Sequence, residues 1–179
     1  MTTKQAKVII IGATDASQLS AQVDAAHAAG AVVIAYDRLI KGTANVDYYV
    51  AFDNFKVGEL QGQALLEGMK KKKPTGPYTI ELFSGSPDDN NAGVFFDGAM
   101  SVLKPEIDKG NVVVGSGQTQ VTQTAIDGWK AENAQRRMDA LLTSTYNGDK
   151  TLDGVLSPND TLARAIITSV KAPASRSRS

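Results

Sequence analysis

Residues 7–12 read Lys-Val-Ile-Ile-Ile-Gly, and residues 31–36 read Ala-Val-Val-Ile-Ala-Tyr. Both segments are unbroken apolar runs rich in β-branched residues, a pattern typical of strands that are covered on both faces in a parallel sheet. Between them, we expect Asp15 to cap a helix that Gly30 ends. A crossover of this length joins parallel strands, so the segment predicts an α/β fold.

Strands and helices continue to alternate after this first unit. Residues 70–77 interrupt the alternation with four lysines and two prolines, and we place the main boundary of the chain there. Two α/β halves therefore follow each other along the sequence. The expected strands are 48–52, 78–83, 111–114 and 154–156, and the expected helices are 57–69, 91–103, 131–146 and 161–171.

The composition of the 179 residues excludes several kinds of function. Its 19 Lys+Arg side chains balance 19 Asp+Glu side chains, so no net charge attracts the chain to nucleic acid or to an anionic membrane. The chain has no cysteine, which excludes disulfides, thiolate zinc sites and a cysteine nucleophile. The early apolar run 8–11 is too short for a membrane span or a signal-peptide core. We therefore expect no nucleic acid partner, no membrane insertion and no export signal in this chain.

The loops that follow the expected strands are rich in polar side chains. In an open parallel sheet, ligands bind beyond the carboxyl ends of the strands. Carboxylates, amides and guanidinium groups there can each make two neighbouring hydrogen bonds, which matches the vicinal hydroxyls of a sugar. Trp129, the only tryptophan, offers a face for the C–H side of a pyranose, although such a tryptophan is more often a half-buried packing residue. The polar loops contain Thr14-Asp15, Asp37-Arg38, Asp53-Asn54, Ser86 to Asn91, and Asn159-Asp160.

Each of these loop residues also has an ordinary structural interpretation. For Asp15 and Asp53 we favour helix capping. The residues Asp37 and Arg38 form either a local ion pair or a pair of ligands, and the spacing favours neither. A single cap does not account for the four consecutive polar residues 88–91, which favours a ligand role for them.

Motifs for catalysis and for metal binding are missing from the sequence. There is no glycine-rich dinucleotide fingerprint, no phosphate-loop lysine and no nucleophile elbow. Residues 88–93 match a calcium loop only in part, because Ala92 and Ala99 replace two of its oxygen ligands. The carboxylates of Asp88 and Asp89 are adjacent, an arrangement that seldom supports glycosidase chemistry. We expect no enzymatic activity, no metal and no cofactor.

Four strings in the sequence match a known family: Ala35-Tyr-Asp-Arg-Leu-Ile40, Phe52-Asp-Asn54, Gly85-Ser-Pro-Asp-Asp-Asn-Asn91 and Gly98-Ala-Met-Ser-Val-Leu-Lys-Pro105. They resemble bacterial periplasmic xylose-binding and multiple-sugar-binding proteins, which have the type I periplasmic-binding-protein fold, and the resemblance spans 5–171. It implies two doubly wound lobes that close over a neutral aldose of the xylose, glucose, galactose or arabinose class without chemistry. It also implies an ABC transporter permease as partner and a periplasmic location.

The same resemblance assigns the residues that hold the sugar. Phe96 stands near the place where xylose-binding relatives carry an arginine, so strict specificity for xylose is not implied. The implied ligands are Asp37 and Arg38 in the first lobe, and Asp89, Asn91, Trp129 and Asn159 in the second.

The resemblance also implies that both lobes are incomplete, because the chain begins near the third strand of the first lobe and stops before a later strand that supplies an Asp ligand. An incomplete cleft predicts weak sugar binding, or none, by these 179 residues. The implied divisions are a partial N-terminal lobe at 1–53, a hinge-crossing helix and linker at 54–77, a partial C-terminal lobe at 78–171 and a disordered tail at 172–179.

Two other classes of function compete with sugar binding for import. A sugar-responsive transcriptional repressor uses an effector domain of the same architecture, but it carries a helix-turn-helix ahead of that domain, and nothing before Lys7 can form one. An α/β enzyme acting on sugars or phosphates needs a base or a phosphate loop, and the sequence offers neither.

Overall fold

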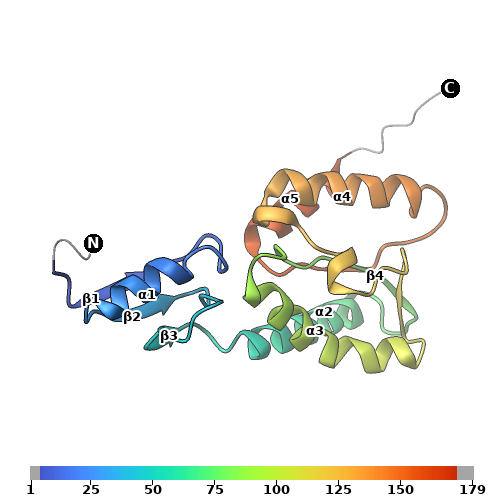
Figure 1. Ribbon diagram of the computed structural model, residues 1–179. Coiled ribbons are helices and arrows are strands. Elements are labelled where there is room, and N and C mark those ends of the chain that lie inside the picture. The colour runs from blue at the N-terminus through green and yellow to red at the C-terminus, as the bar shows by residue number, and fades with distance from the viewer. Residues whose placement is uncertain (1–4, 173–179) are drawn as a thin grey trace.

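The computed structural model describes residues 5–172 as two parallel sheets, each with helices of its own (Figure 1). The predicted α/β fold is confirmed. None of the helices between residues 5 and 172 is long and apolar enough to cross a membrane. The tail expected at 172–179 lies, from residue 173 on, outside the described residues.

The helices and strands divide into two consecutive groups along the chain, one for each sheet. The first part contains β1 (Val8–Ile11), α1 (Ser20–Ala28), β2 (Val32–Tyr36) and β3 (Tyr48–Val50). The second contains α2 (Asn54–Lys72), β4 (Tyr78–Leu82), α3 (Asn90–Asp108), β5 (Val112–Val114), the 3-10 turns η2 (Val121–Gln123) and η3 (Asp127–Trp129), α4 (Ala131–Ser144), β6 (Gly154–Leu156) and α5 (Asp160–Lys171).

The first sheet has the order β1-β2-β3, and its strands are parallel, as the apolar runs predict. Helix α1 covers one face, where Val23 of the helix joins Val33 and Ala35 of β2 in one buried cluster. Gly30 lies just beyond the helix with φ +78°, a left-handed conformation that favours glycine and stops the helix. The predicted strand, helix and strand unit is therefore confirmed.

Helix α1 begins later than the sequence predicts. Leu19 occupies its N-cap position and makes no side-chain capping bond, so the prediction that Asp15 caps this helix is wrong. The Asp15 carboxylate instead accepts bonds from the backbone N–H (2.8 Å) and the hydroxyl (2.6 Å) of Ser17. Aspartate side chains compete with the helical backbone through such local turns, and here the turn delays the start of the helix.

The face of the first sheet opposite α1 has no covering layer among the described residues. The apolar runs predicted strands covered on both faces, and this part of the prediction does not hold for residues 5–172. Ile10 is 66% exposed and Tyr48 is 63% exposed. We call this surface the open face; it consists of Val8, Ile10, Val32, Ile34, Tyr36, Tyr48 and Val50, which pair across the strands on one side.

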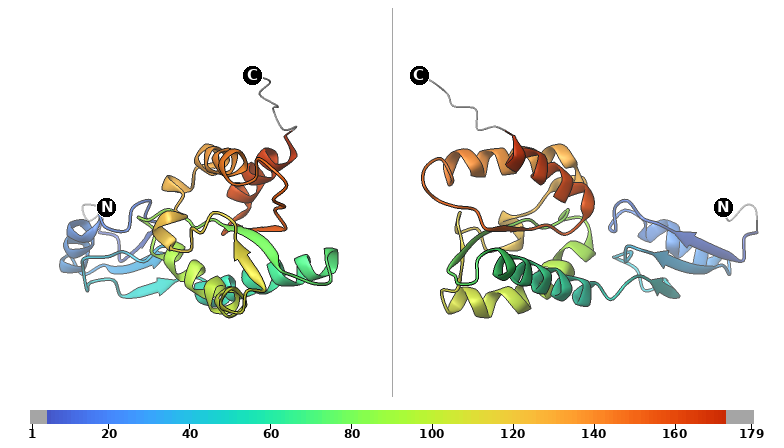
Figure 2. Two further views of the ribbon diagram at one scale, coloured as in Figure 1. Left: turned by 90° about the vertical axis from the view of Figure 1, so that its right-hand side faces the viewer. Right: turned by 180° about the vertical axis from the view of Figure 1, so that it is seen from behind.

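The second sheet has β4 at its centre, with β5 on one side and β6 on the other. Helices α2 and α3 cover one face, and α4 and α5 cover the opposite face (Figures 1 and 2). The loops after β4 and β6 therefore leave toward opposite faces, which makes the carboxyl end of β4 the topological switch point. The segment that follows Leu82 begins where an open α/β sheet holds its ligand.

Helix α2 packs along α3 at very short range because glycines line the contact. A Cβ atom at Gly58 would lie 2.0 Å from the carbonyl oxygen of Phe95, and one at Gly98 would lie 2.1 Å from that of Phe55. The predicted cap at Asp53 is confirmed, since its carboxylate accepts from a backbone N–H of the first turn at 3.0 Å. Because α2 packs with the second sheet, we propose that the lobes divide between β3 and α2.

Candidate functional site

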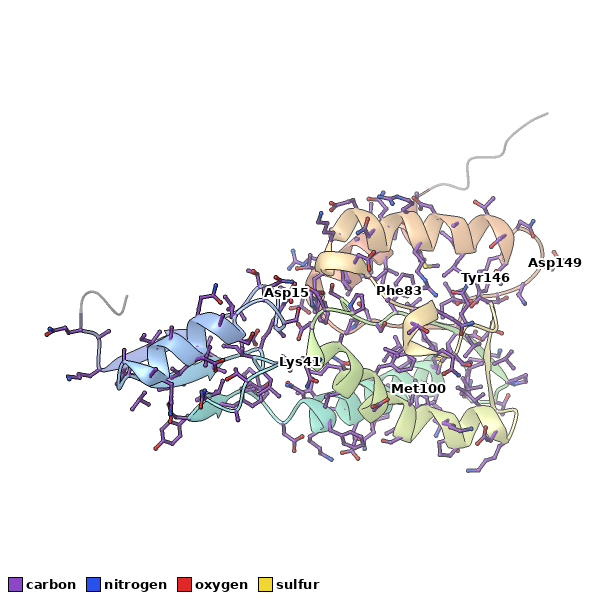
Figure 3. The ribbon with its side chains drawn as sticks, in the orientation of Figure 1. Asp15, Lys41, Phe83, Met100, Tyr146 and Asp149 are labelled. Carbon is purple, nitrogen blue, oxygen red and sulfur yellow. The ribbon has the colours of Figure 1, made fainter. Side chains whose placement is uncertain are left out.

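The two sheets meet through the loops at the carboxyl ends of their strands. Asp37 and Arg38 follow β2, while Asp89 and Asn91 stand at the start of α3. Figure 1 shows the two bodies joined at this end, and Figure 3 shows Asp15, from the loop after β1, on the same side. The strand-end argument thus brings these predicted residues to one place, which we call the interlobe site.

Asp89 is the centre of the interlobe site. Its Oδ2 atom lies 2.9 Å from Arg38 Nε and accepts a bond from the Trp129 indole N–H at 3.1 Å. Its Oδ1 atom accepts from the backbone N–H of Asn91 at 2.9 Å, which caps α3. The Asp89 side chain is only 5% exposed, so its charge is compensated by protein groups rather than by water. One carboxylate therefore serves as helix cap and as a bridge between the two sheets.

The sequence left open whether Asp37 and Arg38 form a local ion pair with each other, and the structure answers this question. Arg38 pairs with Asp89 of the other sheet and donates through Nη1 to the carbonyl of Thr14, and no ion pair joins it to Asp37 among the described residues. Asp37 has φ +67°, an uncommon conformation for a residue other than glycine, and its side chain is exposed. The Asp37 carboxylate is therefore accessible from solvent.

Asn91 joins the second sheet to three separate parts of the first half of the chain. Its Nδ2 donates to the Asp37 carbonyl at 2.9 Å across 54 positions of sequence. Its Oδ1 accepts from the Tyr49 hydroxyl at 3.2 Å and from Asn54 Nδ2 at 2.9 Å. The residue is buried, so these bonds satisfy most of its amide. Asn91 therefore fixes the relative position of the two sheets as well as lining the site.

Tyr49 and Asn54 belong to the interlobe site although neither was predicted as a ligand. Asn54 belongs to a polar segment that the sequence placed after a strand, and in the structure it is the first residue of α2; this polar segment was a usable signal for the site. Tyr49 lies inside β3, and the only sequence signal that it could belong to the site is its polar hydroxyl, which the ring carries far from the backbone. Partial burial and the nearby Asp37 and Asp89 carboxylates raise the pKa of Tyr49, so the phenol stays a hydrogen-bond donor at neutral pH.

Tyr49→Phe is expected to loosen this junction without unfolding either sheet. The change removes the hydroxyl that donates to Asn91 and to the Asp37 carbonyl (3.1 Å), which costs about 1 kcal/mol for a partly buried bond. The measurement is thermal unfolding with limited proteolysis around 51–53. Tyr48→Phe, on the exposed side of the same strand, is the matched control, and equal effects of the two substitutions would contradict the contact.

Trp129 reaches the site at the end of the long loop between β5 and α4. Its ring lies directly over Gly85, where a Cβ atom would come within 2.0 Å of the indole. The ring also packs at the edge of the buried cluster between the second sheet and α4. Trp129 is thus half-buried, as the ordinary interpretation predicts, and it is bonded to the central carboxylate as well.

Asn159 stands at the carboxyl end of β6 and is occupied by a structural bond. Its Oδ1 accepts from the backbone N–H of Leu162 at 2.9 Å and so caps α5. No hydrogen bond between described residues connects Asn159 to Asp89 or Asn91. Its role as a sugar ligand stays a prediction, with only the amide nitrogen free of the cap.

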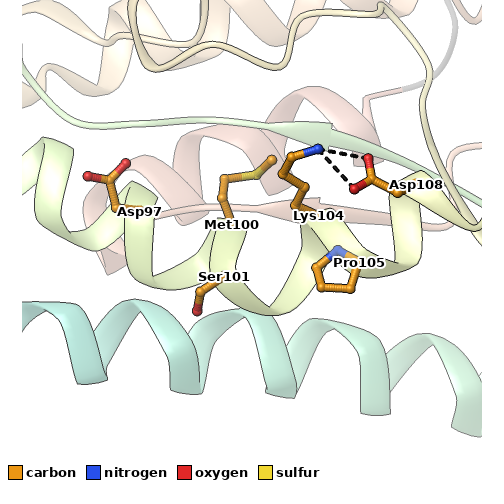
Figure 4. A pocket seen from close by; sticks show the side chains of 6 residues that line it. All are labelled: Asp97, Met100, Ser101, Lys104, Pro105 and Asp108. Atoms are coloured by element: carbon orange, nitrogen blue, oxygen red, sulfur yellow. Dashed lines mark hydrogen bonds and ion pairs between the residues drawn. The ribbon is translucent and has the colours of Figure 1, made fainter.

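The hollow along α3 lies away from this site. Its volume is about 340 Å³, and it runs along the outer side of the helix, where Lys104 is already paired with Asp108 at 2.8 Å (Figure 4). Its lining comes from a single helix, and its side chains do not converge on one point. Among residues 5–172, no group of three or more histidine and carboxylate side chains could hold a metal ion. The interlobe site remains the place where polar groups from both sheets converge.

Comparison with known proteins identifies a family and several relatives of this chain. Residues 1–178 match the periplasmic binding protein domain family. The chain is 53% identical over 171 residues to the multiple sugar-binding periplasmic receptor ChvE of Rhizobium radiobacter, and 40% identical over 165 residues to the D-xylose-binding periplasmic protein of Escherichia coli K12. These alignments cover 96% and 92% of this chain but 48% and 45% of the two relatives.

A solved structure shows the same arrangement. It is an ABC transporter solute-binding protein from Clostridium phytofermentans with bound β-D-glucose, 40% identical in sequence, and it superposes with a TM-score of 0.90 over 96% of this chain and 53% of its own. The chain belongs to the periplasmic binding protein domain family. Within it, the chain is similar in sequence and fold to sugar-binding proteins, and it spans about half the length of the relatives it matches.

Proposed function

We propose that this chain is part of a receptor that binds a neutral monosaccharide between its two sheets and delivers it to an ABC importer, without making or breaking a bond. The aldose belongs to the xylose, glucose, galactose or arabinose class. Relatives that are 40% identical or more are named for sugar binding, and the glucose-bound structure supports the same ligand class. A permease partner and a periplasmic location are proposed on the same basis.

The observation that carries the proposal is the group of Arg38, Asp89 and Trp129. A guanidinium and a carboxylate, one from each sheet, lie 2.9 Å apart and present fork-shaped hydrogen-bonding groups beside an aromatic ring. A sugar needs both features, because its hydroxyls pair with forks and its C–H face packs on a ring. The effector domain of a sugar-responsive repressor is the alternative, and a DNA-binding domain joined to this chain would favour it.

Sugar binding is tested directly by titrating the 179-residue chain with glucose and xylose. Trp129 is the only tryptophan, so its fluorescence reports on the interlobe site alone. We expect a saturable change with a dissociation constant on the order of 1 mM, weak because an incomplete cleft makes fewer contacts. Saturable binding of a ligand of another class, with no binding of glucose, xylose, galactose or arabinose, would contradict the proposal.

Phosphorylated sugars are expected to bind less tightly than free aldoses. Arg38 is the one cation of the proposed ligand set, and it is already paired with Asp89, while the Asp37 carboxylate is exposed nearby and repels a phosphate dianion. Titration with glucose and glucose 6-phosphate in the same buffer measures the difference. Tighter binding of the phosphate would point instead to an enzyme or receptor for sugar phosphates.

A further inference from the structure

The loop that carries Trp129 is held along its whole length by the strand that it crosses. This segment, 115–130, connects β5 to α4 and is called the tryptophan loop below. Three polar side chains from β4 and its extension, Glu81, Ser84 and Ser86, bond to it, and each is at most 2% exposed. Buried polar groups of this kind are retained where they fix a single geometry, because leaving them unsatisfied is costly.

Glu81 holds the start of the tryptophan loop. Its carboxylate accepts from the backbone N–H (2.8 Å) and the hydroxyl (2.7 Å) of Ser116, and from the Tyr146 hydroxyl at 2.7 Å. Burial and the adjacent Glu81 carboxylate raise the pKa of Tyr146, so the phenol keeps its proton and donates. The start of the loop is therefore anchored to β4 through Glu81, whose carboxylate is also bonded to Tyr146, two residues beyond the end of α4.

Ser84 holds the middle of the tryptophan loop. Its hydroxyl donates to the Val121 carbonyl at 3.0 Å and accepts from the Thr124 hydroxyl at 3.1 Å. The backbones also pair, from Ser84 N–H to the Thr124 carbonyl (2.9 Å) and from Ile126 N–H to the Gly85 carbonyl (3.1 Å). The extension of β4 and the loop thus run side by side like two short strands.

Ser86 holds the turn that delivers the tryptophan. Its hydroxyl oxygen accepts from the Gly128 N–H at 2.8 Å, and its hydroxyl hydrogen is donated to the Asp88 carboxylate. Gly128 and Trp129 have φ +65° and +56°, two consecutive left-handed residues. This conformation is an outlier for a bulky side chain, and it persists only where neighbouring contacts enforce it.

Gly85 makes the space that the indole fills. A Cβ atom at this position would lie 2.0, 2.2 and 2.6 Å from three ring carbons of Trp129. No side chain fits there while the ring keeps its place. The indole is then held between Gly85 and the carboxylate of Asp89, to which its N–H donates at 3.1 Å.

We propose that Ser86 and Gly85 are positioning residues for Trp129: Ser86 fixes the backbone turn, and Gly85 admits the indole ring against the strand. The assignment rests on the proposed sugar-binding function, in which the indole contacts the sugar ring. It follows that these two residues, which do not touch the sugar in this proposal, set how well the aromatic face is presented to it. A displaced ring lowers affinity by about five- to tenfold, the equivalent of one lost hydrogen bond.

The test uses the fluorescence of the single tryptophan in the 179-residue chain without sugar. Ser86→Ala and Gly85→Ala are compared with two matched controls. Ser101→Ala removes a hydroxyl that bonds only within α3, and Gly148→Ala adds a methyl group where nothing lies within 4 Å. We expect both test variants to shift the emission to longer wavelength and to increase quenching by acrylamide, with far-UV circular dichroism unchanged and both controls like the parent.

Parent-like emission and quenching in both test variants would overturn the assignment. Loss of the folded circular dichroism spectrum in both would overturn it as well, because the residues would then support the fold rather than the ring; if one variant unfolds, the other decides. A second arm measures glucose affinity, and a displaced ring with unchanged affinity also overturns it. If the parent chain binds no sugar, the ligand-free fluorescence alone decides the assignment, because it still reports the ring position; binding of a different class of ligand would refute the proposed function and not the assignment.

Discussion

Asp89→Ala is expected to reduce monosaccharide affinity by roughly ten- to a hundredfold, which corresponds to the about 1.5–3 kcal/mol of a hydrogen bond to a charged group. The substitution removes the bridge between Arg38 and the Trp129 indole, so both proposed ligands lose their fixed position along with the carboxylate itself. The fold should survive, because the buried clusters of the two sheets do not depend on this side chain. The measurement is a glucose titration by Trp129 fluorescence with a thermal melt.

Two further substitutions separate the roles of Asp89. Asp89→Asn keeps an oxygen that can cap α3 but removes the charge that faces Arg38, so it should retain the melting temperature and still lose affinity. Asp97→Ala, at an exposed position of the same helix, is the control and should change neither. If Asp89→Ala bound glucose normally, or if it lost most of its stability, Asp89 would be a structural cap rather than a sugar ligand.

Most of the fold could be predicted because each strand is visible in a short, continuous stretch of sequence. The β-branched runs that form β1 and β2 are continuous, and the alternation with helices requires parallel pairing. The ends of the helices were harder to predict, because a polar side chain near a helix end can bond either within a local turn or to the first turn of the helix. Asp53 caps α2 as predicted, whereas Asp15 turns back onto Ser17 and leaves α1 to begin at Ser20.

The membership of the candidate site could be predicted in part, but its pairing could not. The rule that ligands gather at the carboxyl ends of parallel strands pointed to the loops that contain Asp37, Arg38, Asp89 and Asn91, and the family resemblance named these four residues as ligands. It could not show that Arg38 turns away from its neighbour to pair with Asp89, because that contact depends on how the two sheets are placed. Tyr49 was missed for the same reason, since a tyrosine inside a strand gives no local sign that its hydroxyl crosses to the other sheet.

The open face of the first sheet is expected to make the 179-residue chain self-associate. Its seven side chains carry no charge, and Val8, Ile10, Tyr36 and Tyr48 are each more than half exposed. Contiguous apolar surface of this kind drives association in water, and the free edges of β1 and β3 add unpaired backbone groups. On size-exclusion chromatography we expect the parent chain to elute as a dimer or larger species whose size grows with concentration.

Ile10→Lys should shift this equilibrium strongly toward the monomer. Ile10 is 66% exposed on the β1 part of the open face, so a lysine there is solvated in the monomer and costs little. In a two-fold contact the same position occurs twice, and burying two unpaired ammonium groups costs at least about 2–4 kcal/mol, or roughly thirty- to a thousandfold in the association constant. Ile167→Lys, at a 48% exposed position on α5, adds the same charge outside the open face and should leave association unchanged. A parent chain that stays monomeric at high concentration, or equal effects of the two lysines, would show that the open face does not drive assembly.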